Sequence, residues 1–89
     1  MESRTLVISN TLGMHARAAA KFVRAASAFR AKISVSRDER TMDGKSILGL
    51  LLLAASRGTS ILVTAEGEDE REAIETLSRL VLDKFDEDA

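Results

Sequence analysis

Short segments with the twofold hydrophobic period of strands alternate with segments that have a helical period, and this alternation limits the folds open to the chain. Strand patterns cover residues 4–9, 31–37, 40–42 and 60–65. Helical patterns cover 16–28 and follow Ser46 and Asp69. The order βαββαβα predicts an α+β fold, in which helices cover one sheet. Because 89 residues are too few for two stable cores, we expect one domain over residues 1–89.

Residues at the ends of the predicted helices have capping chemistry. Ser46 can cap the second helix, and Gly58 can end it by taking a left-handed conformation. Asp69 can cap the third helix, with Glu72 in the capping-box position three residues later. The buried face of the third helix is predicted to contain Ala73, Ile74, Leu77, Leu80, Val81 and Phe85.

Charge is distributed unevenly, although the formal net charge is only -1. Residues 1–37 contain seven Lys or Arg and a single acidic residue, whereas residues 66–89 contain ten Asp or Glu and three Lys or Arg. In the first helix, Arg17, Lys21 and Arg24 recur at helical spacing and form a basic stripe. The only aromatic residues are three Phe, which disfavours nucleic acid as a partner. We expect this basic face to bind an acidic protein or a phosphate.

Several classes of protein and site are disfavoured by composition. The chain has no cysteine, so it offers neither disulfides nor thiolate metal ligands, and we expect no metal and no cofactor. The most apolar stretch, 47–55, is far shorter than the roughly 20 residues needed to cross a membrane. The first residues lack the pattern of a secretory signal, so we expect a cytoplasmic protein. Gly44-Lys45-Ser46 is similar to the end of a Walker A loop, but Glu39 occupies the position of its first glycine.

His15 is the only histidine, and it lies between Gly13 and the first turn of the predicted helix. The free amides of that turn, at Ala16 and Arg17, favour an anion. With the Arg17 cation they disfavour imidazolium, so we expect a neutral ring, which is the form that attacks phosphorus. The same groups would then stabilise a phosphohistidine dianion. From position alone, a histidine that only caps the helix or lies on the surface fits equally well.

Two motifs resemble one known family. Residues 10–22, NTLGMHARAAAKF, resemble the active-site signature of the histidine-containing phosphocarrier HPr family, including its nitrogen-branch NPr type. Residues 44–49, GKSILG, resemble the second signature of that family. The resemblance implies an open-faced β-sandwich, with a four-stranded antiparallel sheet covered on one side by three helices. It also implies that His15 accepts a phosphoryl group through Nδ1 and that Arg17 stabilises the phosphate.

The resemblance further implies partners and a regulatory site. Enzyme I of a phosphoenolpyruvate-dependent phosphotransferase system would load His15, and an enzyme IIA domain would unload it. Ser46 would be a regulatory site for an HPr kinase/phosphorylase, although a plain helix cap is the alternative. The docking surface would contain Lys21, Arg24, Ile47, Leu48 and Leu51, of which the apolar three are also candidates for the core. We expect a monomer that is a substrate of phosphotransferases rather than an enzyme.

Two positions depart from the family pattern. The family usually has proline where this chain has Ala18, and many members have a polar residue where it has Leu12. Alanine suits a helix, so we expect only a small effect on stability at Ala18, whereas Leu12 leaves more of the anion binding to Arg17 and the amides.

The alternative function is that of a mainly regulatory protein of this family, without sugar transport.

Overall fold

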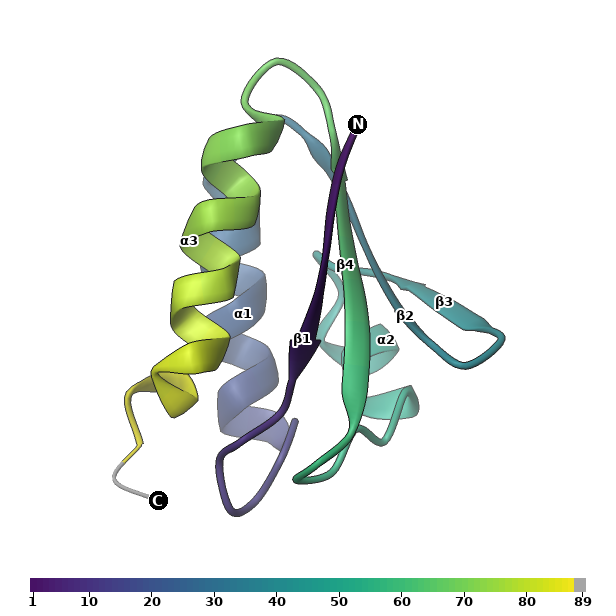
Figure 1. Ribbon diagram of the computed structural model, residues 1–89, viewed down its shortest axis with the longest axis vertical. Coiled ribbons are helices and arrows are strands. Elements are labelled where there is room, and N and C mark those ends of the chain that lie inside the picture. The colour runs from purple at the N-terminus through teal and green to yellow at the C-terminus, as the bar shows by residue number, and fades with distance from the viewer. Residues whose placement is uncertain (88–89) are drawn as a thin grey trace.

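The computed structural model describes residues 1–87. Its four-stranded antiparallel sheet has the order β1-β4-β2-β3. The strands are β1 (Glu2–Val7), β2 (Lys32–Arg37), β3 (Arg40–Asp43) and β4 (Ser60–Glu66). The helices are α1 (Ala16–Ser27), α2 (Ile47–Leu52) and α3 (Glu70–Leu82), and a 3-10 turn, η1 (Lys84–Asp86), follows. In Figure 1, α1 and α3 run side by side along the sheet. The predicted α+β class and element order are confirmed, while a single domain over 1–89 stays a prediction.

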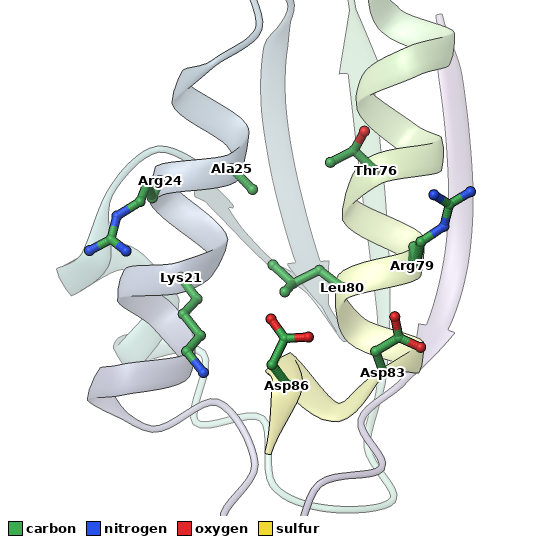
Figure 2. A pocket seen from close by; sticks show the side chains of 8 residues that line it. All are labelled: Lys21, Arg24, Ala25, Thr76, Arg79, Leu80, Asp83 and Asp86. Atoms are coloured by element: carbon green, nitrogen blue, oxygen red, sulfur yellow. The ribbon is translucent and has the colours of Figure 1, made fainter. Parts of the chain in front are cut away.

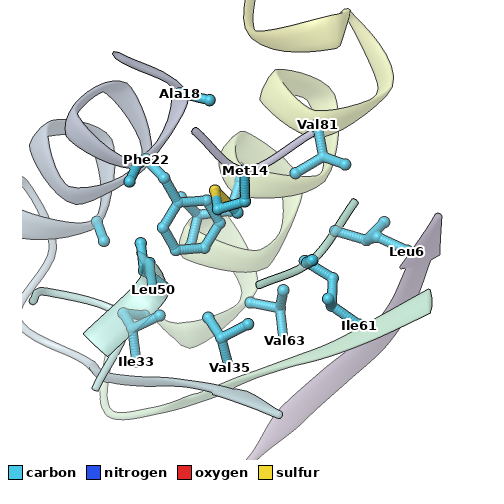
Figure 3. Packing of buried hydrophobic residues seen from close by; sticks show 14 of the residues in the cluster. Leu6, Met14, Ala18, Phe22, Ile33, Val35, Leu50, Ile61, Val63 and Val81 are labelled. Atoms are coloured by element: carbon cyan, nitrogen blue, oxygen red, sulfur yellow. The ribbon is translucent and has the colours of Figure 1, made fainter. Parts of the chain in front are cut away.

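One face of the sheet supplies part of the core, and the helices and the segments between them supply the rest. Ile33 and Val35 of β2 and Val63 of β4 are almost completely buried, because alternate residues of a strand point to the same face. Figure 3 shows these side chains pointing toward Phe22 of α1. Removing a buried ring such as that of Phe22 costs about 3–5 kcal/mol, so this contact fixes α1 against the sheet.

The first strand begins earlier than predicted. It spans Glu2–Val7 rather than residues 4–9, because Ser3 pairs with Thr64 of β4 even though its side chain is polar. Backbone pairing needs no apolar side chain, so the hydrophobic pattern misplaces this boundary. Within residues 1–87, no helix is long and apolar enough to cross a membrane.

The end of α2 also differs from the prediction. The helix ends at Leu52, and Ala54 takes a left-handed conformation with φ 52°. Gly58, which was expected to end the helix, has φ 88° in the turn that precedes β4. The guanidinium of Arg37 donates to the carbonyls of Leu53 and Ala54 at 2.8 Å each and so satisfies backbone acceptors after the helix.

The start of α3 lacks the predicted capping box. Asp69 is the N-cap residue, but its carboxylate accepts hydrogen bonds from the backbone N–H groups of Arg30 and Ala31, each at 2.9 Å. These bonds, the one from Arg30 first, hold the pKa of Asp69 below its ordinary value. Glu70, rather than Glu72, reaches back and accepts from the Gly67 N–H at 3.1 Å. Asp69 therefore ties the start of α3 to the loop after α1.

The predicted buried face of α3 is correct in the helix and wrong at its end. Ala73, Ile74, Leu77 and Val81 are buried, and Leu80 is partly buried. Phe85 is completely buried as predicted but lies outside α3, in η1, with φ 56°. The chain turns after Leu82, so the residues that follow do not continue the helix axis.

Candidate functional site

His15 is held at the start of α1 by contacts between two loops. Gly13 has φ 67°, a conformation that favours glycine, and a Cβ there would lie 2.6 Å from the Ala55 carbonyl oxygen. The N–H of Met14 donates to that oxygen at 2.8 Å, and the Met14 side chain is buried. The loop can therefore make this turn only with glycine at position 13, and His15 becomes the N-cap residue of α1.

The first turn of α1 presents amides that the helix itself does not use. The Ala19 N–H makes the first intrahelical bond, to the His15 carbonyl, at 2.8 Å. The amides of Ala16, Arg17 and Ala18 precede it and have no carbonyl of the helix to bind. The His15 side chain makes no capping bond, and the first turn contains no acidic residue. This end of the helix can therefore bind an anion.

Within residues 1–87, the His15 imidazole is anchored through one of its two nitrogens. Nε2 lies 2.5 Å from Oε2 of Glu87, whose Oε1 accepts a hydrogen bond from Asn10 Nδ2 at 3.0 Å. Nδ1 has no hydrogen-bond partner among residues 1–87. The ring keeps about a quarter of its surface accessible, with a side-chain exposure of 24%. A nitrogen atom is therefore available to a partner on a ring whose orientation is fixed.

Glu87 is a site residue that the sequence did not indicate. It stands 72 positions after His15, and no motif or period links the two. Burial alone would raise the pKa of Glu87, but the hydrogen bonds from Asn10 and His15 outweigh burial and hold that pKa below its ordinary value. The ionised carboxylate is a pure acceptor, so it favours a proton on Nε2.

The predicted basic stripe lies on the outside of α1, but its members differ. Arg17 and Arg24 are exposed, and Arg17 makes no side-chain bond within residues 1–87. Lys21 is half-buried, and its Nζ donates to the carbonyl oxygen of Phe85 at 2.6 Å. Figure 2 shows Lys21 and Arg24 on one wall of a groove of about 460 Å³, opposite α3 and Asp86. Lys21 thus holds the chain after α3 and is a weaker candidate for partner contacts.

The start of α2 has the predicted cap. It also exposes apolar side chains that would be covered if they belonged to the core. Ser46 Oγ accepts a hydrogen bond from the Gly49 N–H at 3.0 Å. Ile47, Leu48 and Leu51 are 43%, 67% and 37% exposed, so they are not core residues. The helix is anchored instead by Leu50, which is completely buried. Leu12 and Leu52 are also exposed, at 70% and 53%.

Comparison with known proteins identifies the family. The family described as "PTS HPr component phosphorylation site" matches residues 2–83. The chain is 46% identical, over 88 residues, to the phosphocarrier protein HPr of Xylella fastidiosa (strain 9a5c), with 99% of each chain covered. The crystal structure of HPr from Thermoanaerobacter tengcongensis superposes with a TM-score of 0.96 at 43% identity and covers 100% of both chains.

A further structure from that organism is an HPr dimer, which matches with a TM-score of 0.79 at 44% identity, covering 98% of this chain and 100% of the other. The monomer expectation therefore stays a prediction. The fold, the two motifs and the whole-length matches agree, and this chain belongs to the HPr family of phosphotransferase-system phosphocarriers.

Proposed function

We propose that this chain carries a phosphoryl group on Nδ1 of His15, receives it from enzyme I and passes it to an enzyme IIA domain. The observation that carries the proposal is the asymmetry of the ring, because Nε2 is bound to Glu87 while Nδ1 has no partner among the described residues. Three amides of the first turn of α1 stand beside this histidine without an intrahelical partner.

In the transfer step, groups of this chain have two tasks. One group attacks phosphorus, and the others stabilise the negative charge of the phosphoryl oxygens. The lone pair of Nδ1 attacks phosphorus, the bond between phosphorus and the donor atom of enzyme I breaks, and the donor keeps that electron pair. The phosphoryl oxygens then accept hydrogen bonds from the amides of Ala16 and Arg17 and from the Arg17 guanidinium. Transfer to enzyme IIA reverses these changes and regenerates the free ring. The chain is thus a carrier that one protein loads and another unloads.

The docking surface combines exposed charge and exposed apolar area. Arg17 and Arg24 supply the charge from α1, and Leu48 supplies the largest apolar exposure of α2. The two helices pack against each other, so both contributions belong to neighbouring elements. An apolar patch with charged residues around it is typical of protein-binding faces, and its basic residues fit an acidic partner.

Intact mass measured after incubation with phosphoenolpyruvate and purified enzyme I tests the proposal. The parent chain should gain one acid-labile, base-stable phosphoryl group, and addition of an enzyme IIA domain should remove it. His15→Ala should gain none, whereas Ser46→Ala, the matched control at the other helix start, should gain one. An unchanged mass gain in His15→Ala would contradict the proposal.

A further inference from the structure

The segment after α3 is held in an unfavourable backbone conformation by contacts with the site. Lys84, Phe85 and Asp86 have φ values of 57°, 56° and 62°, and three consecutive left-handed residues other than glycine are costly. Such a conformation persists only where tertiary contacts hold it. Here Phe85 is completely buried, and Lys21 donates to its carbonyl oxygen at 2.6 Å. These two contacts at Phe85 hold the segment so that Glu87, two residues later, reaches His15 at the start of α1.

The Glu87 side chain is held at both of its oxygens. Oε1 accepts from Asn10 Nδ2 at 3.0 Å, and Oε2 lies 2.5 Å from His15 Nε2. Asn10 is completely buried and its Nδ2 also donates to the carbonyl oxygen of Gly13, at 2.8 Å, within the loop that positions His15. The carboxylate is therefore anchored to the same loop as the ring that it contacts.

We propose that Glu87 is a positioning residue that keeps a proton on Nε2 of His15 and thereby restricts phosphorylation to Nδ1. This inference rests on the proposed carrier function and adds to it the origin of the choice between the two ring nitrogens.

The physical reason lies in how a neutral imidazole divides its two roles. One nitrogen carries the proton and the other carries the lone pair that can attack phosphorus. A carboxylate only accepts, so a proton on Nε2 is bound by Glu87 and the lone pair resides on Nδ1. When Nδ1 donates its pair to phosphorus, the ring becomes positively charged while Nε2 keeps its proton. Glu87 then faces an imidazolium and offsets its charge, as the orienting carboxylate does in catalytic triads.

Within residues 1–87, the other charged groups near the ring do not select between the nitrogens in this way. Arg17 lies on the outer surface of α1 and makes no bond to the ring, and Lys21 is engaged by the Phe85 carbonyl. Asp86 stands one residue before Glu87 but contacts neither ring nitrogen. Asp86→Asn therefore removes an equal charge from the same segment and is a matched control for Glu87 variants.

Phosphoramidate, a small phosphoryl donor, tests the proposal without any partner protein. Its P–N bond breaks, ammonia leaves with the electron pair, and a ring nitrogen of His15 bonds to phosphorus. Phosphorus–nitrogen couplings in NMR spectra of the labelled product identify which nitrogen was used. The parent and Asp86→Asn should give the Nδ1 product, and Glu87→Ala should lower the ratio of Nδ1 to Nε2 product by about tenfold or more, the size expected for loss of a charge-assisted hydrogen bond.

A second variant and a second measurement make the test decisive. Glu87→Gln keeps the shape of the side chain without its charge and should give an intermediate ratio. In the unphosphorylated parent, the Nε2 proton should exchange slowly with water, and Glu87→Ala should accelerate that exchange. If Glu87→Ala shows no cooperative unfolding transition, it is not properly folded. Glu87→Gln then takes its place and is judged by the same product ratio and proton exchange. The proposal is overturned if a folded Glu87 variant keeps the parent ratio and slow exchange, or if Asp86→Asn lowers the ratio equally.

The two proposals fail in distinguishable ways. A parent chain that shows the slow Nε2 proton and the Nδ1 product with phosphoramidate, yet is not loaded by enzyme I, contradicts the carrier function alone. A parent chain that is loaded by enzyme I but whose Glu87→Ala variant keeps full selectivity contradicts the role of Glu87 alone.

Discussion

The starts of α1 and α2 are built in opposite ways. At α2, the N-cap residue Ser46 uses its own hydroxyl to bind the Gly49 amide three residues later. At α1, the N-cap residue His15 makes no capping bond, and its ring is held by Glu87 from the far end of the described chain. The α2 cap is therefore local, whereas the α1 start is assembled from distant segments.

If the proposed carrier function is correct, this difference separates a stabilising helix end from a reactive one. A side chain that caps its own helix occupies an amide and fixes its own oxygen, so that the cap contributes mainly to stability. A side chain held from outside leaves the helix amides open for another acceptor, such as a phosphoryl oxygen. On the proposed function, the arrangement at His15 keeps both the attacking nitrogen and the amides that bind the phosphoryl group available.

The largest expected effect distinguishes the glycines at these two helix starts. Gly13→Ala places a Cβ 2.6 Å from the Ala55 carbonyl oxygen at φ 67°, so it should cost about 2 kcal/mol or more and move His15. Gly49→Ala places its Cβ 3.3 Å from Ser46 Oγ within a helix, where alanine is favoured, and should stay within about 1 kcal/mol of the parent. Chemical denaturation measures both. Equal losses of stability would show that the two helix starts are not built differently.

Arg17→Ala tests whether the open amides of α1 suffice to bind the phosphoryl group. The side chain is exposed and unbonded within the described residues, so the fold should remain intact. Loss of a charge-assisted hydrogen bond to the phosphoryl group should slow transfer about ten- to a hundredfold. Stopped-flow loading by enzyme I at low salt measures the rate. An unchanged rate would assign the anion binding to the amides alone.

Two substitutions of Ser46 should have opposite effects. One should lower the stability without slowing loading, and the other should slow loading without lowering the stability. Ser46→Ala removes the acceptor for the Gly49 amide and should cost about 1 kcal/mol, while loading proceeds at the parent rate. Ser46→Asp keeps an acceptor at the N-cap but places a negative charge beside Ile47 and Leu48, so it should unfold near the parent temperature and load more slowly.

Phosphorylation of Ser46 by a kinase should act in the same direction as Ser46→Asp and more strongly, because it adds nearly two negative charges. Thermal unfolding and the rate of loading by enzyme I measure both effects. Early unfolding of Ser46→Asp would make Ser46 chiefly structural. A stable variant with the parent loading rate would exclude this surface from docking.

The smallest expected effect concerns how each helix contributes to docking. Arg24→Ala should weaken the salt dependence of binding to enzyme I, because salt screens exposed charges over about 10 Å at 0.1 M ionic strength. Leu48→Ala should weaken binding by a similar factor at low and high salt, because its contribution is apolar. Calorimetric titrations at two ionic strengths compare the variants. Identical salt dependence of parent and Arg24→Ala would remove α1 charge from the interface.

Sequence patterns predicted the features that depend on neighbouring residues. The structure contains the helices and strands that the hydrophobic periods predict. It also contains the Ser46 cap and the glycine turn before His15, which depend on neighbouring residues. The contact of Glu87 with His15 depends on how the chain turns after α3, which no local pattern records. Asp69 shows the same limitation, because its side chain finds amides of a distant loop instead of its own helix.

Burial of apolar residues near α2 was equally hard to predict. A run of leucines and isoleucine gives no period that separates Leu50, which is buried, from Leu48 and Leu51, which are not. The helix has only six residues, so packing against α1 and β3 decides which side chains are covered. The residue pattern alone therefore left their exposure open, whereas the family resemblance assigned Leu48 and Leu51 to a docking surface.

We propose that the phosphoryl group is carried by Nδ1 of His15, the ring nitrogen that has no partner among residues 1–87. The most direct test is an NMR spectrum of the chain labelled with nitrogen-15 and loaded by enzyme I and phosphoenolpyruvate. We predict a single phosphorus signal with a one-bond coupling to Nδ1 and a protonated Nε2. A coupling to Nε2, or a phosphoryl group on a residue other than His15, would contradict the account.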